Sequence, residues 1–124
     1  MMTEELIQTG ESKVLCFAEQ GTTFDDEAVR EGISQAIERQ AEWIALPIKR
    51  LPDSFFDLRT GVAGLWLQKL VNYRLGLAIL GDVEPWQRKS KALEALIVEC
   101  NRGKSCWFLP DLASLQARLA KDLQ

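Results

Sequence analysis

LGLAIL, residues 75–80, is the stretch that decides the fold, and Gly81 and Asp82 follow it directly. A nearly continuous apolar run of this length is typical of a strand that is buried on both faces of a sheet. Strands of that kind belong to parallel sheets whose faces are covered by helices. The sequence therefore predicts a parallel sheet that includes residues 75–80, with a turn at Gly81-Asp82.

Segments with helical periodicity flank this strand on both sides. Before it, residues 60–72 place their apolar side chains at spacings of three and four, on one wide face of a helix. After it, Ser90 is positioned to cap a second helix, and Gly103 stands where a C-terminal glycine is typical. A strand between two helices is the repeating unit of an α/β protein.

The same alternation extends towards both ends of the chain. The other predicted strands are residues 5–9, 13–19, 42–48 and 106–109. Residues 25–40 are predicted to form a helix that Thr22 or Thr23 caps, and a last helix follows Pro110. Gly10 lies between the first two strands, which therefore form a hairpin.

The order is strand-strand-helix, followed by three strand-helix units. We expect one α/β domain over residues 1–124, with a mostly parallel sheet of about five strands, an antiparallel N-terminal hairpin and helices packed on the sheet. A chain of 124 residues can bury about two-thirds of its unfolded surface, so it needs no metal or disulfide to support its core.

The composition excludes several classes of function. There is no histidine, which removes His-based catalytic triads and His-ligated metals. The net charge is −3, from 15 basic and 18 acidic residues, so the chain lacks the basic footprint of a nucleic-acid-binding protein. No nucleophile–base pair is visible, and we expect a protein that is not an enzyme.

The N-terminal sequence and the cysteines indicate the compartment and the absence of a cofactor. The N-terminus, MMTEELIQTG, lacks the pattern of a signal peptide, and no apolar run approaches the length of a membrane span. The three cysteines are widely spaced and indicate reduced, buried thiols in a cytoplasmic protein. Three thiolates without histidine make a poor zinc set, so we expect no metal and no cofactor.

The most unusual segment is DSFFDLRTG, residues 53–61, which joins a predicted strand to a predicted helix. Ligands of open α/β sheets bind at the carboxyl ends of the strands, where this segment should lie, and a helix N-terminus favours an anion. The candidate ligand-binding or regulatory residues are Asp57, Arg59, Thr60, Gly61 and Asp82. The alternative interpretation is that Asp57 or Thr60 only caps the helix. Lys49 and Arg50 should share this rim, as part of an anion site or as solvated surface charges.

A stripe of mostly small or uncharged residues follows the other side of the helix predicted at residues 60–72. Its members are Gly61, Gly64, Leu65, Gln68 and Asn72. Small residues let another backbone come close, so the stripe predicts an interaction face for a protein partner or a second copy. The alternatives are that it faces solvent or lies under a neighbouring helix. Trp86, expected in an exposed polar loop, is the candidate aromatic hot spot.

Several motifs resemble a bacterial family catalogued as domain of unknown function 4180. They are FFDLRTGVAGLWLQKLVNYR at residues 55–74, LAILGD at residues 77–82, SKAL at residues 90–93 and ECNRG at residues 99–103. This resemblance implies membership of that family and brings no assigned activity.

The element order is similar to that of STAS domains (sulfate transporter and anti-sigma-factor antagonist). That resemblance implies a regulatory module that binds proteins, with Asp57 and Thr60-Gly61 near the position of the phosphorylated serine. Here Arg59 replaces a small residue, and only one hydroxyl remains.

We therefore expect a cytoplasmic binding or regulatory module that acts on a protein partner or associates with itself. The alternative is a small-anion-binding protein or enzyme that uses the rim around Asp57 and Asp82. A second alternative is a structural homo-oligomer that forms through the stripe around Gly64.

Overall fold

The sheet keeps its strands in the order in which they occur along the chain. In the computed structural model, which describes residues 4–122, five strands pair in sequence. β1 (Glu4–Thr9) pairs antiparallel with β2 (Ser12–Phe17), and then β3 (Trp43–Pro47), β4 (Gly76–Leu80) and β5 (Cys106–Leu109) follow as parallel neighbours. The predicted α/β fold, with an antiparallel hairpin and a mostly parallel sheet, is confirmed.

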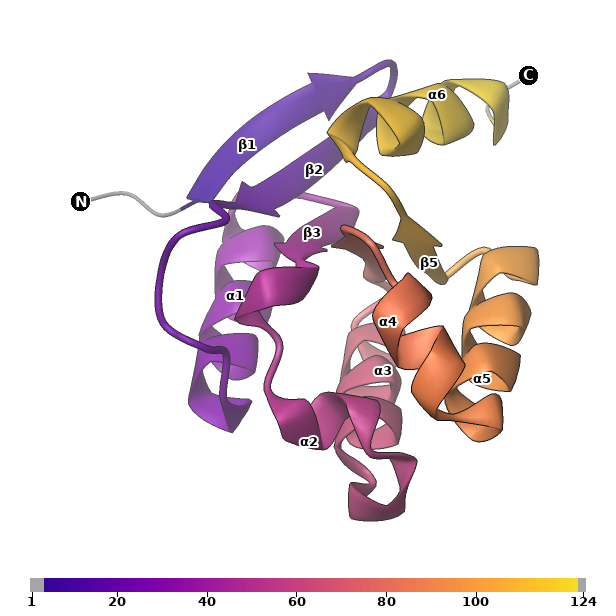
Figure 1. Cartoon of the computed structure of the whole chain (residues 1–124). Helices are drawn as coiled ribbons and strands as arrows, with labels where there is room; N and C mark the ends of the chain where they lie inside the picture. Colours follow the sequence, from indigo (N-terminus) through magenta and orange to yellow (C-terminus); the bar gives the residue numbers. More distant parts are fainter. Residues whose placement is uncertain (1–3, 123–124) are drawn as a thin grey trace.

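Helices cover both faces of the sheet, but unequally. They are α1 (Asp26–Glu38), α2 (Asp53–Phe56), α3 (Val62–Asn72), α4 (Glu84–Lys89), α5 (Lys91–Arg102) and α6 (Leu112–Asp122), with short 3-10 turns η1 (Ile48–Arg50) and η2 (Leu58–Thr60). Figure 1 shows α1, α3 and α5 on one face of the sheet and α6 on the other. Sequential parallel strands joined by right-handed crossovers place every crossover helix on the same face.

Two local predictions near the helix starts are wrong. The cap of α1 is Asp25, whose carboxylate accepts a hydrogen bond from the Ala28 N–H at 2.8 Å, and neither Thr22 nor Thr23 takes this role. Residues 84–89 form the helix α4 where a polar loop is predicted. A proline in the first turn suits that helix, because its missing N–H has no partner there in any case.

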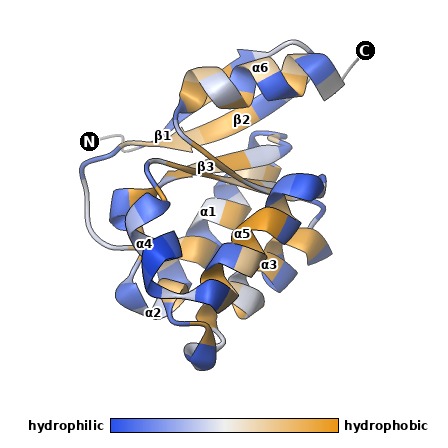
Figure 2. Cartoon of the chain, turned by 45° about the vertical axis from the view of Figure 1, so that its right-hand side comes forward, coloured by the Kyte–Doolittle hydropathy of each residue, from blue (hydrophilic) through white to orange (hydrophobic). Residues whose placement is uncertain are grey.

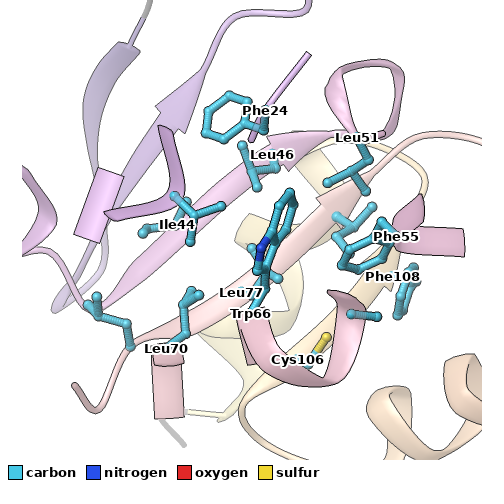
Figure 3. Packing of buried hydrophobic residues seen from close by; sticks show 14 of the residues in the cluster. Phe24, Ile44, Leu46, Leu51, Phe55, Trp66, Leu70, Leu77, Cys106 and Phe108 are labelled. Carbon is cyan, nitrogen blue, oxygen red and sulfur yellow. The ribbon is translucent and has the colours of Figure 1, made fainter. Parts of the chain in front are cut away.

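The larger part of the core lies between the sheet and the layer of α1, α3 and α5. Figure 3 shows Trp66 of α3 at its centre, beside Leu46 and Leu77 of the sheet and Phe55 of α2. The indole N–H of Trp66 donates to Asp26 at 2.7 Å, which joins α3 to the first turn of α1. A buried tryptophan needs such a partner for its one polar group.

The other face of the sheet is built around two tryptophans. Trp43 of β3 and Trp107 of β5 stack with ring centroids 4.3 Å apart, next to Gly76 of the intervening strand. Arg118 of α6 lies 4.0 Å above the ring of Trp107 and donates to the Asn101 carbonyl at 2.5 Å. These contacts hold α6 on the sheet, where Leu115 and Leu119 are buried, and Figure 2 shows α6 on the opposite side of the strands from α3 and α5.

Replacing Gly76 with alanine should destabilise the protein. The new Cβ would lie 2.5 Å from the ring of Trp43, and overpacking of this kind costs about 1–3 kcal/mol. The matched control is Gly103→Ala, because its Cβ would make only an ordinary contact at 3.6 Å with the Cys100 carbonyl. Urea unfolding of both variants measures the difference, and equal stabilities would contradict this account of the Trp43–Trp107 packing.

Candidate functional site

Asp57 and Arg59 form a local ion pair in the turn between α2 and α3. The Nε and Nη2 atoms of Arg59 donate to the two carboxylate oxygens of Asp57, each at 2.9 Å. The backbone N–H of Arg59 donates to the same carboxylate at 3.2 Å. The side-chain hydrogen bond from Arg59 lowers the pKa of Asp57 below its usual range. The pair therefore neutralises itself, although 91% of the Arg59 side chain is exposed.

The hydroxyl of Thr60 closes the same turn. Its Oγ1 lies within donating distance of the carbonyl oxygens of Ser54 (2.6 Å) and Asp57 (2.8 Å), and it accepts a hydrogen bond from the Val62 N–H at 3.2 Å. Gly61 follows in the left-handed region, with φ at 76°, where glycine carries no steric penalty. Asp57 caps the 3-10 turn η2, and the residue that caps α3 is Gly61. The Thr60 hydroxyl therefore links α2, η2 and the first N–H of α3.

Asp82 is occupied in a similar way at the next turn. One of its carboxylate oxygens accepts a hydrogen bond from the Glu84 N–H at 3.0 Å, at the start of α4. The two segments that carry the candidate rim residues do meet, because Phe56 of α2 stacks on Trp86 of α4 with ring centroids 4.6 Å apart. Trp86 is therefore half-buried, and the prediction that it is exposed is wrong.

Arg50 also differs from its predicted role as an exposed charge at the rim. It is only 7% exposed, and it donates to the carbonyl oxygens of Thr22 at 3.0 Å and Ala18 at 3.2 Å. Its guanidinium lies 4.7 Å from the ring of Phe24, and its own carbonyl accepts from the Phe24 N–H at 2.7 Å. Arg50 therefore holds the loop between β2 and α1 against η1 through hydrogen bonds.

A depression of about 240 Å³ lies where the parallel strands end, on the side of α6. Most of its lining is apolar, and its charged groups are the carboxylates of Glu19 and Asp111. Hydrogen bonds from Ser114 lower the pKa of Asp111, which keeps that carboxylate ionised. Such a surface does not suit an anion. The sequence signal for both residues is their place at a strand end: Asp111 follows the last predicted strand closely, and Glu19 is the last residue of the strand predicted at 13–19.

The predicted stripe forms an exposed surface, which we call the α3 face. It consists of Gly61, Gly64, Leu65, Gln68 and Asn72, all of which are exposed. A methyl group added at Gly61 or Gly64 would meet no other part of the described chain within 4 Å, and Leu65 is 50% exposed. The Gln68 side chain donates to Asn72 at 2.9 Å. The alternative in which a neighbouring helix covers this stripe is therefore excluded for the described residues.

Residues 4–122 contain no group of three or more Cys, Asp or Glu side chains placed to hold a metal ion. No helix in this part of the chain combines the length and the apolar character that crossing a membrane requires.

A family model described as "Domain of unknown function (DUF4180)" matches residues 9–119. The match covers most of the chain, and the protein therefore belongs to this family. It runs from the last residue of β1 into α6, so it includes both the α3 face and the turn around Asp57. No curated protein matches the chain.

Arg59→Ala should return the pKa of Asp57 towards the usual carboxyl value. In the folded protein Arg59 lowers that pKa, so the pair stabilises the fold at neutral pH, and this contribution is lost as the pH falls through the lowered value. Carbon-detected NMR titration of the Asp57 carboxyl group measures the shift. Arg59→Lys is the control, since it keeps the positive charge but cannot donate two parallel hydrogen bonds as the guanidinium does. An unchanged pKa of Asp57 in Arg59→Ala would contradict the conclusion that Arg59 lowers this pKa.

Thr60→Ala should lower the free energy of unfolding by about 1 kcal/mol, because it removes the hydroxyl that closes the turn before α3. Thr60→Ser keeps the hydroxyl, so its free energy of unfolding should fall by only about a few tenths of a kcal/mol. Chemical denaturation distinguishes the two variants. Equal losses from both would show that the hydroxyl has no part in the turn.

Proposed function

We propose that this protein is a non-enzymatic binding module of the bacterial cytosol, and that it associates with a second copy of itself through the α3 face. The observation that carries the proposal is the exposure of this uncharged surface at the middle of the helical layer. Figure 1 shows α3 between α1 and α5, so its outer side is central to that side of the molecule. All five residues of the α3 face are exposed there.

The chemistry of the α3 face suits a protein contact. None of its residues is charged, so covering it removes no ion from water, which is the most costly part of burying a surface. The centres of protein interfaces are depleted of charged residues for this reason. Leu65, half exposed, supplies apolar area. Gln68 and Asn72 supply hydrogen-bonding groups beside it.

A two-fold axis suits this surface because a projecting side chain and a hollow are adjacent on one helix. Leu65 projects from α3, and the neighbouring Gly64 leaves open space. In a two-fold contact each residue meets the partner surface reciprocally. Two α3 helices that cross near Gly64 would set each Leu65 against the glycine of the other copy. The absence of side chains at Gly61 and Gly64 would permit a short distance between the helix axes.

Three further observations support a cytosolic binding module over the small-anion alternative. The three cysteines are free thiols, as expected in a reducing compartment. The ionic groups of Asp57 and Arg59 neutralise each other, and the strand-end depression presents carboxylates. The resemblance of the predicted element order to STAS domains is the reason for proposing a regulatory role for the association. Thr60 is not part of this proposal, because its hydroxyl is engaged in the turn.

Leu65→Glu should convert the dimer to a monomer, because it places two carboxylates against each other across the two-fold contact. Val98→Glu is the matched control, since Val98 of α5 is similarly exposed (42%) and lies outside the α3 face. We expect the dissociation constant to rise at least about 100-fold for Leu65→Glu, as burial of unpaired charge predicts, and to stay unchanged for Val98→Glu. Sedimentation equilibrium over a range of protein concentrations measures both.

Gly64→Trp provides a second variant that fills the hollow without adding charge, and it should also give monomers. Circular dichroism checks that each variant is folded. A wild-type protein that remains monomeric at millimolar concentration would overturn self-association. A Leu65→Glu variant that dimerises as tightly as the wild type would overturn the assignment of the α3 face.

A further inference from the structure

Cys100 of α5 and Cys106 of β5 line the same cavity, although five residues separate them in the chain. An interaction between the two thiols lowers the pKa of Cys100 and raises the pKa of Cys106. The turn between them is itself held by hydrogen bonds. The Gly103 N–H donates to the Cys100 carbonyl at 3.1 Å, and the Trp107 indole N–H donates to the Gly103 carbonyl at 2.8 Å. The turn that connects the two cysteines is therefore ordered.

Both cysteines line a cavity of about 230 Å³ that is open to solvent. α3 contributes Leu67 and Val71 to the same cavity, so its walls are largely apolar. Cys100 is half-buried, while Cys106 lies deeper and is 5% exposed. A small, uncharged reagent that enters this cavity therefore meets both cysteines, and Cys100 is the more accessible of the two.

The surroundings also distinguish Cys100 from Cys16. The hydrogen bond from the Cys106 thiol lowers the pKa of Cys100, against opposing effects of burial and of Glu99, and it raises the pKa of Cys106. Burial, with a smaller effect of Glu5, raises the pKa of Cys16 to about 11. Because the thiolate is the nucleophile, we expect Cys100 to react faster than Cys16 or Cys106.

We propose that Cys100 and Cys106 form a reversible disulfide when the protein meets a hydroperoxide. The Cys100 thiolate attacks one oxygen of hydrogen peroxide, the O–O bond breaks and hydroxide leaves, which produces a sulfenic acid on Cys100. The Cys106 thiol then attacks the Cys100 sulfur, the S–S bond forms, the S–O bond breaks and water leaves. The two thiols lose two hydrogen atoms in total, and the peroxide is reduced to two molecules of water.

This disulfide would join the last turn of α5 to the first residue of β5, beside the C-terminal half of α3. It is independent of the proposed self-association, because neither cysteine belongs to the α3 face. A thiol such as reduced glutathione would return the pair to the dithiol by exchange. The pair would therefore be a peroxide-responsive modification site on a module that otherwise has free thiols.

Peptide mapping tests the proposal directly on the wild-type protein. Trypsin cleaves after Arg102 and Lys104, which lie between the two cysteines, so the disulfide would link peptide 92–102 to peptide 105–118. Cys16 lies in the separate peptide 14–30 and serves as an internal control. After treatment with hydrogen peroxide and alkylation of the remaining thiols, we expect the linked pair, an alkylated Cys16 and an intact chain two hydrogen atoms lighter. Dithiothreitol should restore the separate peptides.

Rates and variants complete the test. At neutral pH Cys100 should be alkylated at least about tenfold faster than Cys16, because the larger thiolate fraction outweighs its lower intrinsic nucleophilicity. Cys16→Ser should leave disulfide formation unchanged, and Cys100→Ser should abolish it. Cys106→Ser should instead accumulate a sulfenic acid on Cys100 that dimedone traps.

Two outcomes for the wild-type protein would overturn the proposal, and neither depends on the folding of a variant. One is oxidation of Cys16 as fast as oxidation of Cys100. The other is conversion of Cys100 to a sulfinic acid while Cys106 remains a free thiol. Sedimentation equilibrium of the oxidised and the reduced protein measures self-association separately, so failure of the disulfide proposal can be distinguished from failure of the dimer proposal.

Discussion

The sequential order of the parallel strands is the constraint on which the rest of the structure depends. Because β2, β3, β4 and β5 are neighbours in chain order, the helices that connect them share one face of the sheet. α3 therefore becomes the middle helix of that layer, and its outer side has no further layer to cover it among the described elements. The opposite face depends on α6, which comes after the last strand and is held there by its contacts with the Trp43–Trp107 pair.

The polar groups near the strand ends serve mainly to hold local structure. Asp57 and Arg59 bind each other, Thr60 and Asp82 satisfy backbone N–H groups, and Arg50 holds the loop after β2. Side chains that are occupied in this way have few free hydrogen-bonding positions for a substrate. The α3 face, by contrast, is uncharged and exposed. The proposed self-association rests on this division of roles.

Much of the fold was accessible from local patterns, and most of the errors share one origin. The Ser90 cap of α5, the apolar strand at β4 and the hairpin all follow from residues close together in sequence, and all are present. Trp86 was mispredicted because its burial depends on Phe56, thirty positions earlier. Arg50 was mispredicted because its partners, Ala18 and Thr22, lie far upstream in the chain. The cap of α1 was mispredicted for a different reason: Thr22, Thr23 and Asp25 lie close together, and each has a side-chain oxygen that can cap a helix.

The sequence by itself determined the five strands, the four longer helices, their order and the residues that form the stripe on α3. Hydrophobic period and capping chemistry are properties of neighbouring residues, so they can be read without knowing how the elements pack. Only the tertiary structure decided that the two indoles stack next to Gly76, that Arg50 is buried and that two of the cysteines line one cavity. Those contacts depend on which strands become neighbours and how closely the helices approach them, and such distances arise only when the whole chain is packed.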